Sequence, residues 1–172
     1  MAVQLPGFVG PHAGLIDWLA GRHIEYEIRE HPEAFTAEAT ARAEHLDPHR
    51  FVKVVGVGAD DGRRVLLALE AQDHVDLAKV RRVLSARDVR LLTEREFADL
   101  APECEAGSIP PVPELFNVPV YVDLALRDVP EIAFAAGSHR FSVHVDRKAW
   151  ERTSGIAYAD IAQDDGRPAW AR

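Results

Sequence analysis

Residues 51–57, Phe-Val-Lys-Val-Val-Gly-Val, decide the fold class, because an apolar, β-branched run of this length is typical of a buried β-strand. Successive strand residues point to opposite faces, so Lys53 shares one face with Phe51, Val55 and Val57. An unpaired ammonium is costly to bury, so this lysine either reaches water past its apolar neighbours or meets an anion in a pocket. Both interpretations stay open here, and the anion that the second suggests is a phosphate.

The composition indicates an ordinary globular domain. The chain has 172 residues, and single domains commonly hold ~100–200. No apolar run approaches the ~20 residues of a membrane span, and the first residues lack the basic start and apolar region of a signal peptide. Cys104 is the only cysteine, which excludes an intrachain disulfide and a cysteine-based zinc site. We therefore expect a cytoplasmic protein without membrane contact.

The charge balance limits the nucleic acids that the chain can bind. A formal net charge of −8 argues against a broad basic surface, and with it against a DNA-binding protein. One local basic cluster covers residues 79–90 and is either a solvated helix face or a phosphate contact. Any contact with nucleic acid should therefore be small and confined to one end of the molecule.

Periodicity and capping residues predict a chain in which helices and strands alternate. Asp61-Gly62 between two apolar runs predicts a hairpin, Thr36 is expected to cap a helix, and Thr93 with Glu96 predicts a capping box. We predict helices over 13–22, 37–44, 76–84, 93–100 and near 149, and strands over 24–28, 51–57, 64–69, 89–92, 118–122, 132–136 and 141–145. The predicted class is α+β (mixed α/β) with a strong antiparallel component.

The predicted domain covers residues 1–152. Residues 153–172 have weak periodicity and mixed charge, and we interpret them as a C-terminal extension of uncertain order. Its candidate anchors are Tyr158, Ile161 and Trp170.

Two further segments join Lys53 as candidates for chemistry. Residues 107–111, Gly-Ser-Ile-Pro-Pro, combine a glycine that permits unusual backbone angles with two prolines that stiffen the chain. Such a loop would hold its backbone N–H and C=O groups in fixed positions. Residues 134–139, Phe-Ala-Ala-Gly-Ser-His, predict a strand that runs into a turn ending at His139.

With these elements in view, residues 11–150 resemble the YbaK/prolyl-tRNA-synthetase-associated family of aminoacyl-tRNA editing domains, also called INS-like deacylases. The resemblance lies in four elements in the order of the family. These are His31 followed by an alanine-rich helix over 36–43, the strand lysine Lys53, the G-x-x-x-P loop at 107–111, and the A-G-S-H turn at 136–139. It implies a largely antiparallel, curved sheet flanked by helices.

The resemblance also implies hydrolysis of the ester that joins a wrong, small amino acid to the 3′-terminal ribose of tRNA. By carry-over, Lys53 would hold the terminal adenosine and its phosphate, Gly107 would serve catalysis, and His139 would orient water or bind the ribose. The remaining residues that the resemblance places at the substrate are Ser108, Ile109, Pro110, Pro111, His31, Gly137 and Ser138. The vicinal ribose hydroxyl would help to activate water, so we expect no metal and no cofactor. The implied partners are the aminoacylated acceptor end of tRNA and an aminoacyl-tRNA synthetase.

Some alternatives remain open. His139 is equally a turn residue with a local hydrogen bond, and a structural role is favoured for His31. Val54 stands where one subfamily, which edits alanine from proline tRNA, has asparagine. A non-catalytic module that binds aminoacyl-tRNA or a nucleotide ligand, and an interaction subunit that docks through residues 153–172, are the competing functional hypotheses.

Overall fold

The computed structural model describes residues 10–166. Its helices are α1 (Ala13–Gly21), α2 (Ala37–Ala43), α3 (Leu77–Val83), α4 (Glu94–Leu100), α5 (Pro113–Phe116), the 3₁₀ helix η1 (Leu124–Asp128) and α6 (Arg147–Ser154). Its strands are β1 (Tyr26–Glu30), β2 (Phe51–Ala59), β3 (Arg64–Glu70), β4 (Val89–Leu91), β5 (Val120–Asp123), β6 (Glu131–Ala135), β7 (Phe141–Asp146) and β8 (Ala157–Ala159).

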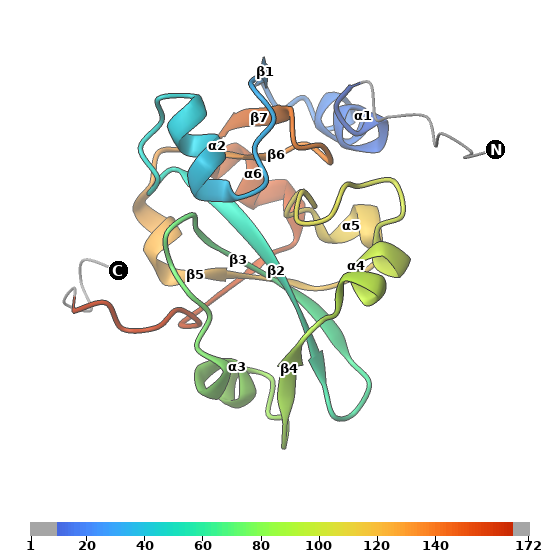
Figure 1. Cartoon of the computed structure of the whole chain (residues 1–172), viewed down its shortest axis with the longest axis vertical. Helices are drawn as coiled ribbons and strands as arrows, with labels where there is room; N and C mark the ends of the chain where they lie inside the picture. Colours follow the sequence, from blue (N-terminus) through green and yellow to red (C-terminus); the bar gives the residue numbers. More distant parts are fainter. Residues whose placement is uncertain (1–9, 167–172) are drawn as a thin grey trace.

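The described strands form one eight-stranded sheet in the order β1-β7-β6-β2-β3-β5-β8, with β4 paired to β2 outside this path. β2 crosses the centre of the molecule and leads toward β4 (Figure 1). Antiparallel pairing joins β1 to β7, β7 to β6, β2 to β3 and β2 to β4, whereas the pairs β2–β6, β3–β5 and β5–β8 are parallel. The predicted class, a mixed fold with a mostly antiparallel sheet, is confirmed.

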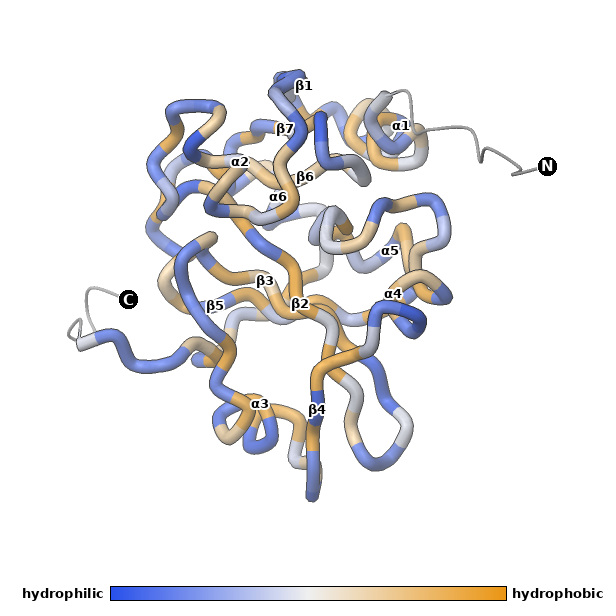
Figure 2. The backbone as a smooth tube through the Cα atoms, in the orientation of Figure 1, coloured by the Kyte–Doolittle hydropathy of each residue, from blue (hydrophilic) through white to orange (hydrophobic). Residues whose placement is uncertain are grey.

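Apolar side chains fill both faces of this sheet, and β2 and β3 are among its most hydrophobic strands (Figure 2). On one face the main core gathers side chains of α1 and α6, including Leu15 and Trp150, over β2, β3 and β5 to β7. On the other face α3 packs through Val80. A third cluster joins Phe51 of β2 to Ala41 of α2, so α2 lies on the face to which Lys53 belongs.

The local signals predicted from the sequence are present. Thr36 caps α2, Thr93 and Glu96 form the capping box of α4, and Gly62 turns the β2–β3 hairpin at a φ of +87°. One difference is α5, which begins inside a stretch that the sequence predicts as loop. Pro113 at the first turn suits a helix start, and Asn117 in the left-handed conformation ends the helix after one turn.

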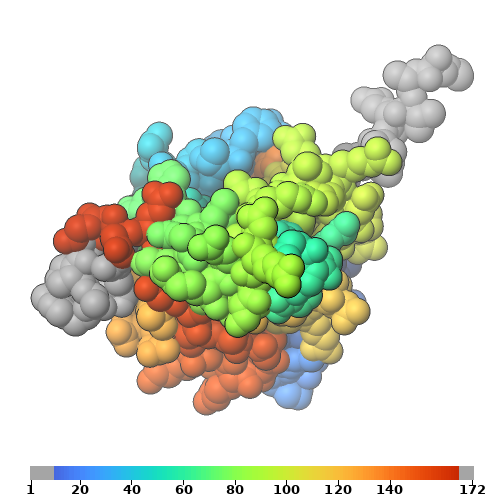
Figure 3. All heavy atoms as spheres, turned by 90° about the horizontal axis from the view of Figure 1, so that it is seen from below, coloured from blue at the N-terminus to red at the C-terminus, as the bar shows by residue number. Residues whose placement is uncertain are grey.

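The segment that follows α6 joins the sheet through β8, and Ile161 is fully buried in the second core cluster. The Asp123 carboxylate accepts hydrogen bonds from the backbone N–H groups of Ile161 and Ala162, each at 3.0 Å. Figure 3 shows this segment beside α3. Trp170, the remaining candidate anchor, lies outside the described residues.

Lys79 of α3 also binds the segment that follows α6. Its ammonium donates to Asp160 and Asp164 at 2.8 and 2.9 Å and to the Ala162 C=O at 2.8 Å. Lys79 is therefore buried and paired, rather than part of a solvated helix face or free for phosphate.

None of the helices in residues 10–166 has the length and apolar character of a membrane span.

Candidate functional site

The centre of the candidate site is an open stretch on one edge of β2. On that edge β2 pairs with β6 only at Phe51 and Val52, and with β4 only from Val57 to Ala59. In a parallel ladder that continued, the Val54 N–H would donate to the Ala135 C=O, but the pairing stops before this step. The sheet therefore splits between β6 and β4, and residues 53–56 border the opening.

The backbone of Val54 points into this opening. The Gly56 C=O accepts a hydrogen bond of 2.9 Å from the Leu92 N–H on the β4 side. In an antiparallel pair, residues two apart direct both backbone groups to the same edge. The N–H and C=O of Val54 consequently face the split. Sequence analysis missed this peptide group, because an apolar side chain gives no sign that its backbone lies at a site.

Lys53 lines the same opening and is half-buried. Burial lowers the pKa of its ammonium below the ordinary 10.5, and the nearby charges of Glu38 and Asp73 act in the opposite direction. Among the described residues its side chain makes no hydrogen bond and no ion pair. This lysine is therefore a desolvated cation that can accept an anionic ligand.

The loop over residues 107–111 is held from several sides. Gly107 is exposed and has a φ of +79°, which glycine adopts without strain. The Ser108 hydroxyl donates to the Glu105 C=O at 2.7 Å, which engages the hydroxyl locally. At the end of the loop the Trp150 indole donates to the Pro111 C=O at 3.1 Å. These bonds fix the loop against the core.

The turn over residues 137–139 is bonded directly to that loop. The Gly137 N–H donates to the Ser108 C=O at 2.9 Å, and the Glu105 N–H donates to the Gly137 C=O at 3.0 Å. The Glu105 carboxylate also accepts from the His139 N–H at 2.5 Å. Glu105 thus joins the two segments, a role that sequence analysis missed because the residue precedes the G-x-x-x-P motif.

His139 has a defined ring position. Its Nε2 lies 2.7 Å from the Ala106 C=O, and since a carbonyl only accepts, Nε2 must carry a hydrogen. Its Nδ1 lies 3.5 Å from Glu105 Oε2. The ring packs edgewise against Phe35, with centroids 4.9 Å apart, at the start of α2.

Together these elements enclose a small cavity. Of the residues predicted for the site, Lys53, Gly107, Ser108, Ile109, Ser138 and His139 line it, together with Thr36, which caps α2, and Thr40 of α2. Its volume of about 20 Å³ is enough for about one water molecule. A larger ligand must move a side chain at the rim, and Phe35, with 67% of its surface exposed, is a candidate.

The structure places His31, one of the predicted substrate residues, outside the lining of this cavity. The ring is buried outside the cavity lining, with Nδ1 2.8 Å from the Pro32 C=O and Nε2 3.8 Å from Glu44 Oε1. Burial would raise the pKa of the Glu44 carboxyl, but hydrogen bonds from His144 and Ser142 outweigh it and the pKa is lowered. His31 therefore belongs to a buried polar cluster behind α2.

Gly137, Pro110 and Pro111 also lie outside the lining. Gly137 has a φ of +83°, and a Cβ added there would lie 2.8 Å from the His12 Cβ. The two prolines are buried beneath the loop.

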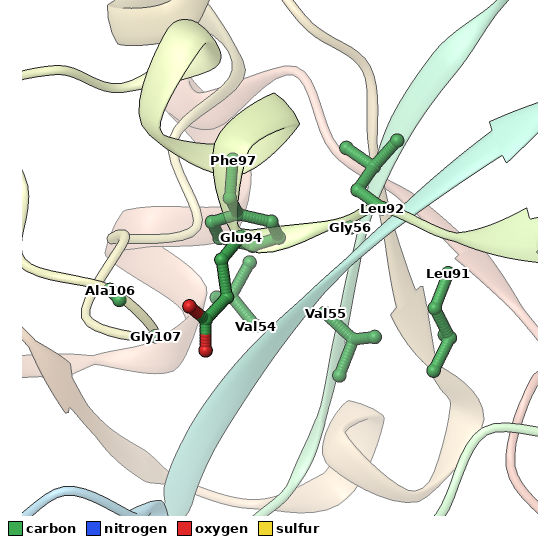
Figure 4. Close-up of a pocket in the computed structure, with 9 residues that line it drawn as sticks. All are labelled: Val54, Val55, Gly56, Leu91, Leu92, Glu94, Phe97, Ala106 and Gly107. Carbon is green, nitrogen blue, oxygen red and sulfur yellow. The ribbon is translucent and has the colours of Figure 1, made fainter.

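A second, larger cavity adjoins the first. It has a volume of about 320 Å³ and is lined by Val54, Val55, Gly56, Leu91, Leu92, Glu94, Phe97, Ala106 and Gly107. Figure 4 shows apolar side chains from β2, β4 and α4 around it, with the Glu94 carboxylate turned toward Gly107 and Val54. Because Val54 and Gly107 line both cavities, the two meet at the open edge of β2.

Cys104 lies beside the site but is not a reactive group. Burial and the charge of Glu103 raise the pKa of its thiol to about 12, so the thiolate that would act as a nucleophile does not form at neutral pH. In the described part of the chain, no group of three or more His, Cys, Asp or Glu side chains is placed to hold a metal ion.

Comparison with known proteins identifies the family. The aminoacyl-tRNA editing domain matches residues 31–153. A proline--tRNA ligase of Acidithiobacillus ferrooxidans is 32% identical over 113 residues, which are 64% of this chain and 19% of the ligase. The chain thus spans about a fifth of the length of the curated relatives that it matches.

Solved structures extend the comparison to the fold. A proposed trans-editing enzyme for prolyl tRNA synthetase superposes with a TM-score of 0.75 at 25% identity, over 87% of this chain and 95% of that one. A scaffold protein used for computational grafting of epitopes superposes with a TM-score of 0.74 at 27% identity, over 86% and 94% of the two chains. On the match over residues 31–153, this chain belongs to the aminoacyl-tRNA editing domain family.

Proposed function

We propose that the protein is an aminoacyl-tRNA deacylase that removes a small, mischarged amino acid from tRNA. The observation that carries the proposal is the convergence of Lys53, the 107–111 loop and the 137–139 turn on one cavity at the open edge of β2. Membership of the editing family and similarity to a proposed trans-editing enzyme support it.

Lys53 is the proposed anchor for the phosphate of the terminal nucleotide. Its ammonium is partly desolvated and makes no ion pair with a described residue, so a phosphate would supply the missing counter-charge. Glu38 and Asp73 are the acidic groups whose charges reach it. A bound phosphate therefore has to compete with their field but displaces no existing ion pair.

Backbone groups are the proposed donors to the ester. Water attacks the ester carbonyl, the bond between the carbonyl carbon and the ribose oxygen breaks, and that oxygen takes up the proton which the water loses. The negative charge that develops on the carbonyl oxygen needs fixed N–H donors. We assign this role to backbone N–H groups of Val54 and of the 107–111 loop, because both segments line the cavity.

His139 is the proposed group that orients water or a ribose hydroxyl, since its ring is held by the Ala106 C=O at Nε2 and lies 3.5 Å from Glu105 Oε2 at Nδ1. The small volume of the cavity, about 20 Å³, favours a small aminoacyl side chain. Rejection of a larger side chain by its size is easier than rejection of a smaller one, because a missing methylene changes binding by only ~1–3 kcal/mol.

The relatives suggest how the substrate reaches this site. In the proline--tRNA ligases that the chain matches, the matching part is about a fifth of the whole protein. We propose that a separate synthetase, or the tRNA acceptor end alone, delivers the substrate in the cytoplasm. A binding module without turnover is the second candidate, and the unpaired Lys53 would serve it equally well.

The test is deacylation of tRNAs carrying Ala, Ser, Thr or Cys by the wild-type protein and by Lys53→Ala. We expect fast release from one or two tRNAs and loss of this activity in the variant. Lys148→Ala is the matched control, because Lys148 is an exposed lysine of α6 outside the cavity. Saturable binding without release by the wild type would favour the binding module, whereas equal rates in all three proteins would remove Lys53 from the mechanism.

A further inference from the structure

The second cavity has the size and lining of a small-ligand site. Its volume of about 320 Å³ lies at the lower end of the ~300–1,000 Å³ that such sites occupy. Apolar side chains from three elements surround it, and Glu94 is its charged side chain. Phe97 is the planar surface in this lining, and a planar apolar surface with a hydrogen-bond acceptor nearby suits a nucleobase.

Gly56 and Phe97 define one wall of this cavity. A Cβ added at Gly56 would lie 2.4 Å from the Phe97 Cε2, so only glycine lets the ring rest against the backbone of β2. The ring is half-buried and packs against the main core, which fixes its plane. Aromatic side chains that are fixed in this way are typical stacking surfaces for bases.

Glu94 supplies the polar edge. It is exposed at the start of α4, and among the described residues its carboxylate makes no hydrogen bond and no ion pair. In Figure 4 the carboxylate points toward Gly107 and Val54, away from Leu91 and Leu92. A carboxylate in this position accepts hydrogen bonds, as acidic side chains do from the exocyclic amino groups of bases.

The position of the cavity relative to the candidate active site restricts the ligand further. In an aminoacylated terminal nucleotide, the base, the ester and the phosphate leave the ribose at different carbons. With the ester in the first cavity and the phosphate at Lys53, the base needs a third place within a few ångströms of the ester. The second cavity meets the first at Val54 and Gly107 and offers that place.

We propose that the second cavity binds the adenine base of the terminal tRNA nucleotide, with Phe97 against the base and Glu94 accepting from its amino group. This inference rests on the proposed function, since it assigns the base of the same substrate. It also explains how a protein with a net charge of −8 can hold a tRNA end, because stacking on a base needs no basic surface.

The test measures binding of stable amide analogues, 3′-alanylamino-3′-deoxyadenosine 5′-phosphate and the uridine and inosine counterparts, by calorimetry or by NMR titration. We expect the adenosine analogue to bind about tenfold or more tightly than the uridine analogue. Glu94→Ala should abolish the preference for adenosine over inosine, since inosine lacks the amino group. Phe97→Leu should weaken adenosine binding by about tenfold and uridine binding by a smaller factor, because both bases lose the stacking surface.

Asp99→Ala is the matched control, because Asp99 is an exposed acidic residue of α4 that does not line the cavity. Glu94 is exposed as well, so its variant keeps the proposal testable if Phe97→Leu unfolds. Equal affinities for the three analogues, no binding of any of them, or equal effects of Glu94→Ala and Asp99→Ala would overturn the proposal. If the wild type binds no analogue and forms a dimer that the Leu91→Asp variant does not form, the cavity is instead an interface with a second copy of the chain.

The two proposals fail in different ways. If tRNA is deacylated but the analogues show no base preference, the base site is wrong and the deacylase stands. If no tRNA is deacylated but the adenosine preference and its loss in Glu94→Ala are found, the cavity is a nucleotide site and the deacylase is wrong.

Discussion

Replacement of Gly137 by alanine separates two effects that hold the 137–139 turn in place. At a φ of +83° an L-residue costs about 1–2 kcal/mol. The new Cβ would also lie 2.8 Å from the His12 Cβ and 3.4 Å from the Cys104 sulfur. His12 cannot move freely, because its N–H donates to the Ala136 C=O at 2.7 Å. Overpacking of this kind costs about 1–3 kcal/mol more.

Gly107 provides the matched comparison. Its φ of +79° is nearly the same, but nothing lies within 4 Å of an added Cβ. Gly107→Ala should therefore lose only the backbone part, about 1–2 kcal/mol, whereas Gly137→Ala should lose about 2–5 kcal/mol. For a chain of this size, the difference between the variants corresponds to a melting temperature lower by roughly 2–12 °C in Gly137→Ala.

The assay is urea unfolding at neutral pH, with deacylation or analogue binding measured on the same samples. Gly107→Ala should remain folded and yet lose activity, because its backbone lies at the rim of the cavity. Equal losses of unfolding free energy in the two variants would refute the reasoning, since the contact with His12 would then contribute nothing.

Three further predictions concern ionisable groups. Because burial lowers the pKa of Lys53, the affinity of the wild type for the phosphate-bearing analogue should fall as the pH rises toward 10.5. Lys53→Arg should remove this fall. Constant wild-type affinity over that pH range would contradict the prediction. Since the pKa of Cys104 is raised to about 12, iodoacetamide should label the native thiol at pH 8 far more slowly than the urea-unfolded one, and equal rates would show that the thiol is accessible. Glu44→Ala should lower the unfolding free energy by about 3–5 kcal/mol at pH 7. Folding lowers the pKa of Glu44, so the contribution of its carboxylate to the unfolding free energy is present above pH 4.5 and lost as the pH falls through the folded-state pKa. The unfolding free energies of the wild type and the variant should therefore become equal in acid. A difference that persists in acid would show that the charged carboxylate is not the source of the stabilisation.

Much of the fold is predictable because its signals are local. Thr36, Thr93 and Glu96 act on backbone groups within a few residues, and the Asp61-Gly62 turn fixes the β2–β3 hairpin. The pairing of distant strands is different, since the alternation of apolar side chains does not specify the neighbour of a strand. The parallel contacts of β2 with β6, and of β5 with β8, could not be predicted from the sequence for this reason.

The site residues also divide into those with a local sequence signal and those that only tertiary contacts reveal. Lys53 and the glycine-containing segments are conspicuous in sequence, because a cation in an apolar strand and glycines at turns are unusual there. The Val54 peptide group and the Glu105 carboxylate became apparent only from tertiary contacts. For His31 the sequence left a substrate contact and a structural role open and favoured the second, and in the structure its ring turns toward Glu44.

The split in the sheet explains why the site needs so few charged groups. A strand edge that is neither paired nor covered is normally a liability, since its N–H and C=O groups seek partners. In β2 the stretch 53–56 lies between two short pairings and beneath the 107–111 loop, so its free peptide group at Val54 is shielded from other proteins but open to a small ligand. Backbone groups are neutral and rigid, so under the proposed function they would bind an ester and a ribose without attracting the rest of the tRNA. For an acidic protein with an unpaired lysine at its site, we expect specificity for the acceptor end and not for the anionic body of the tRNA.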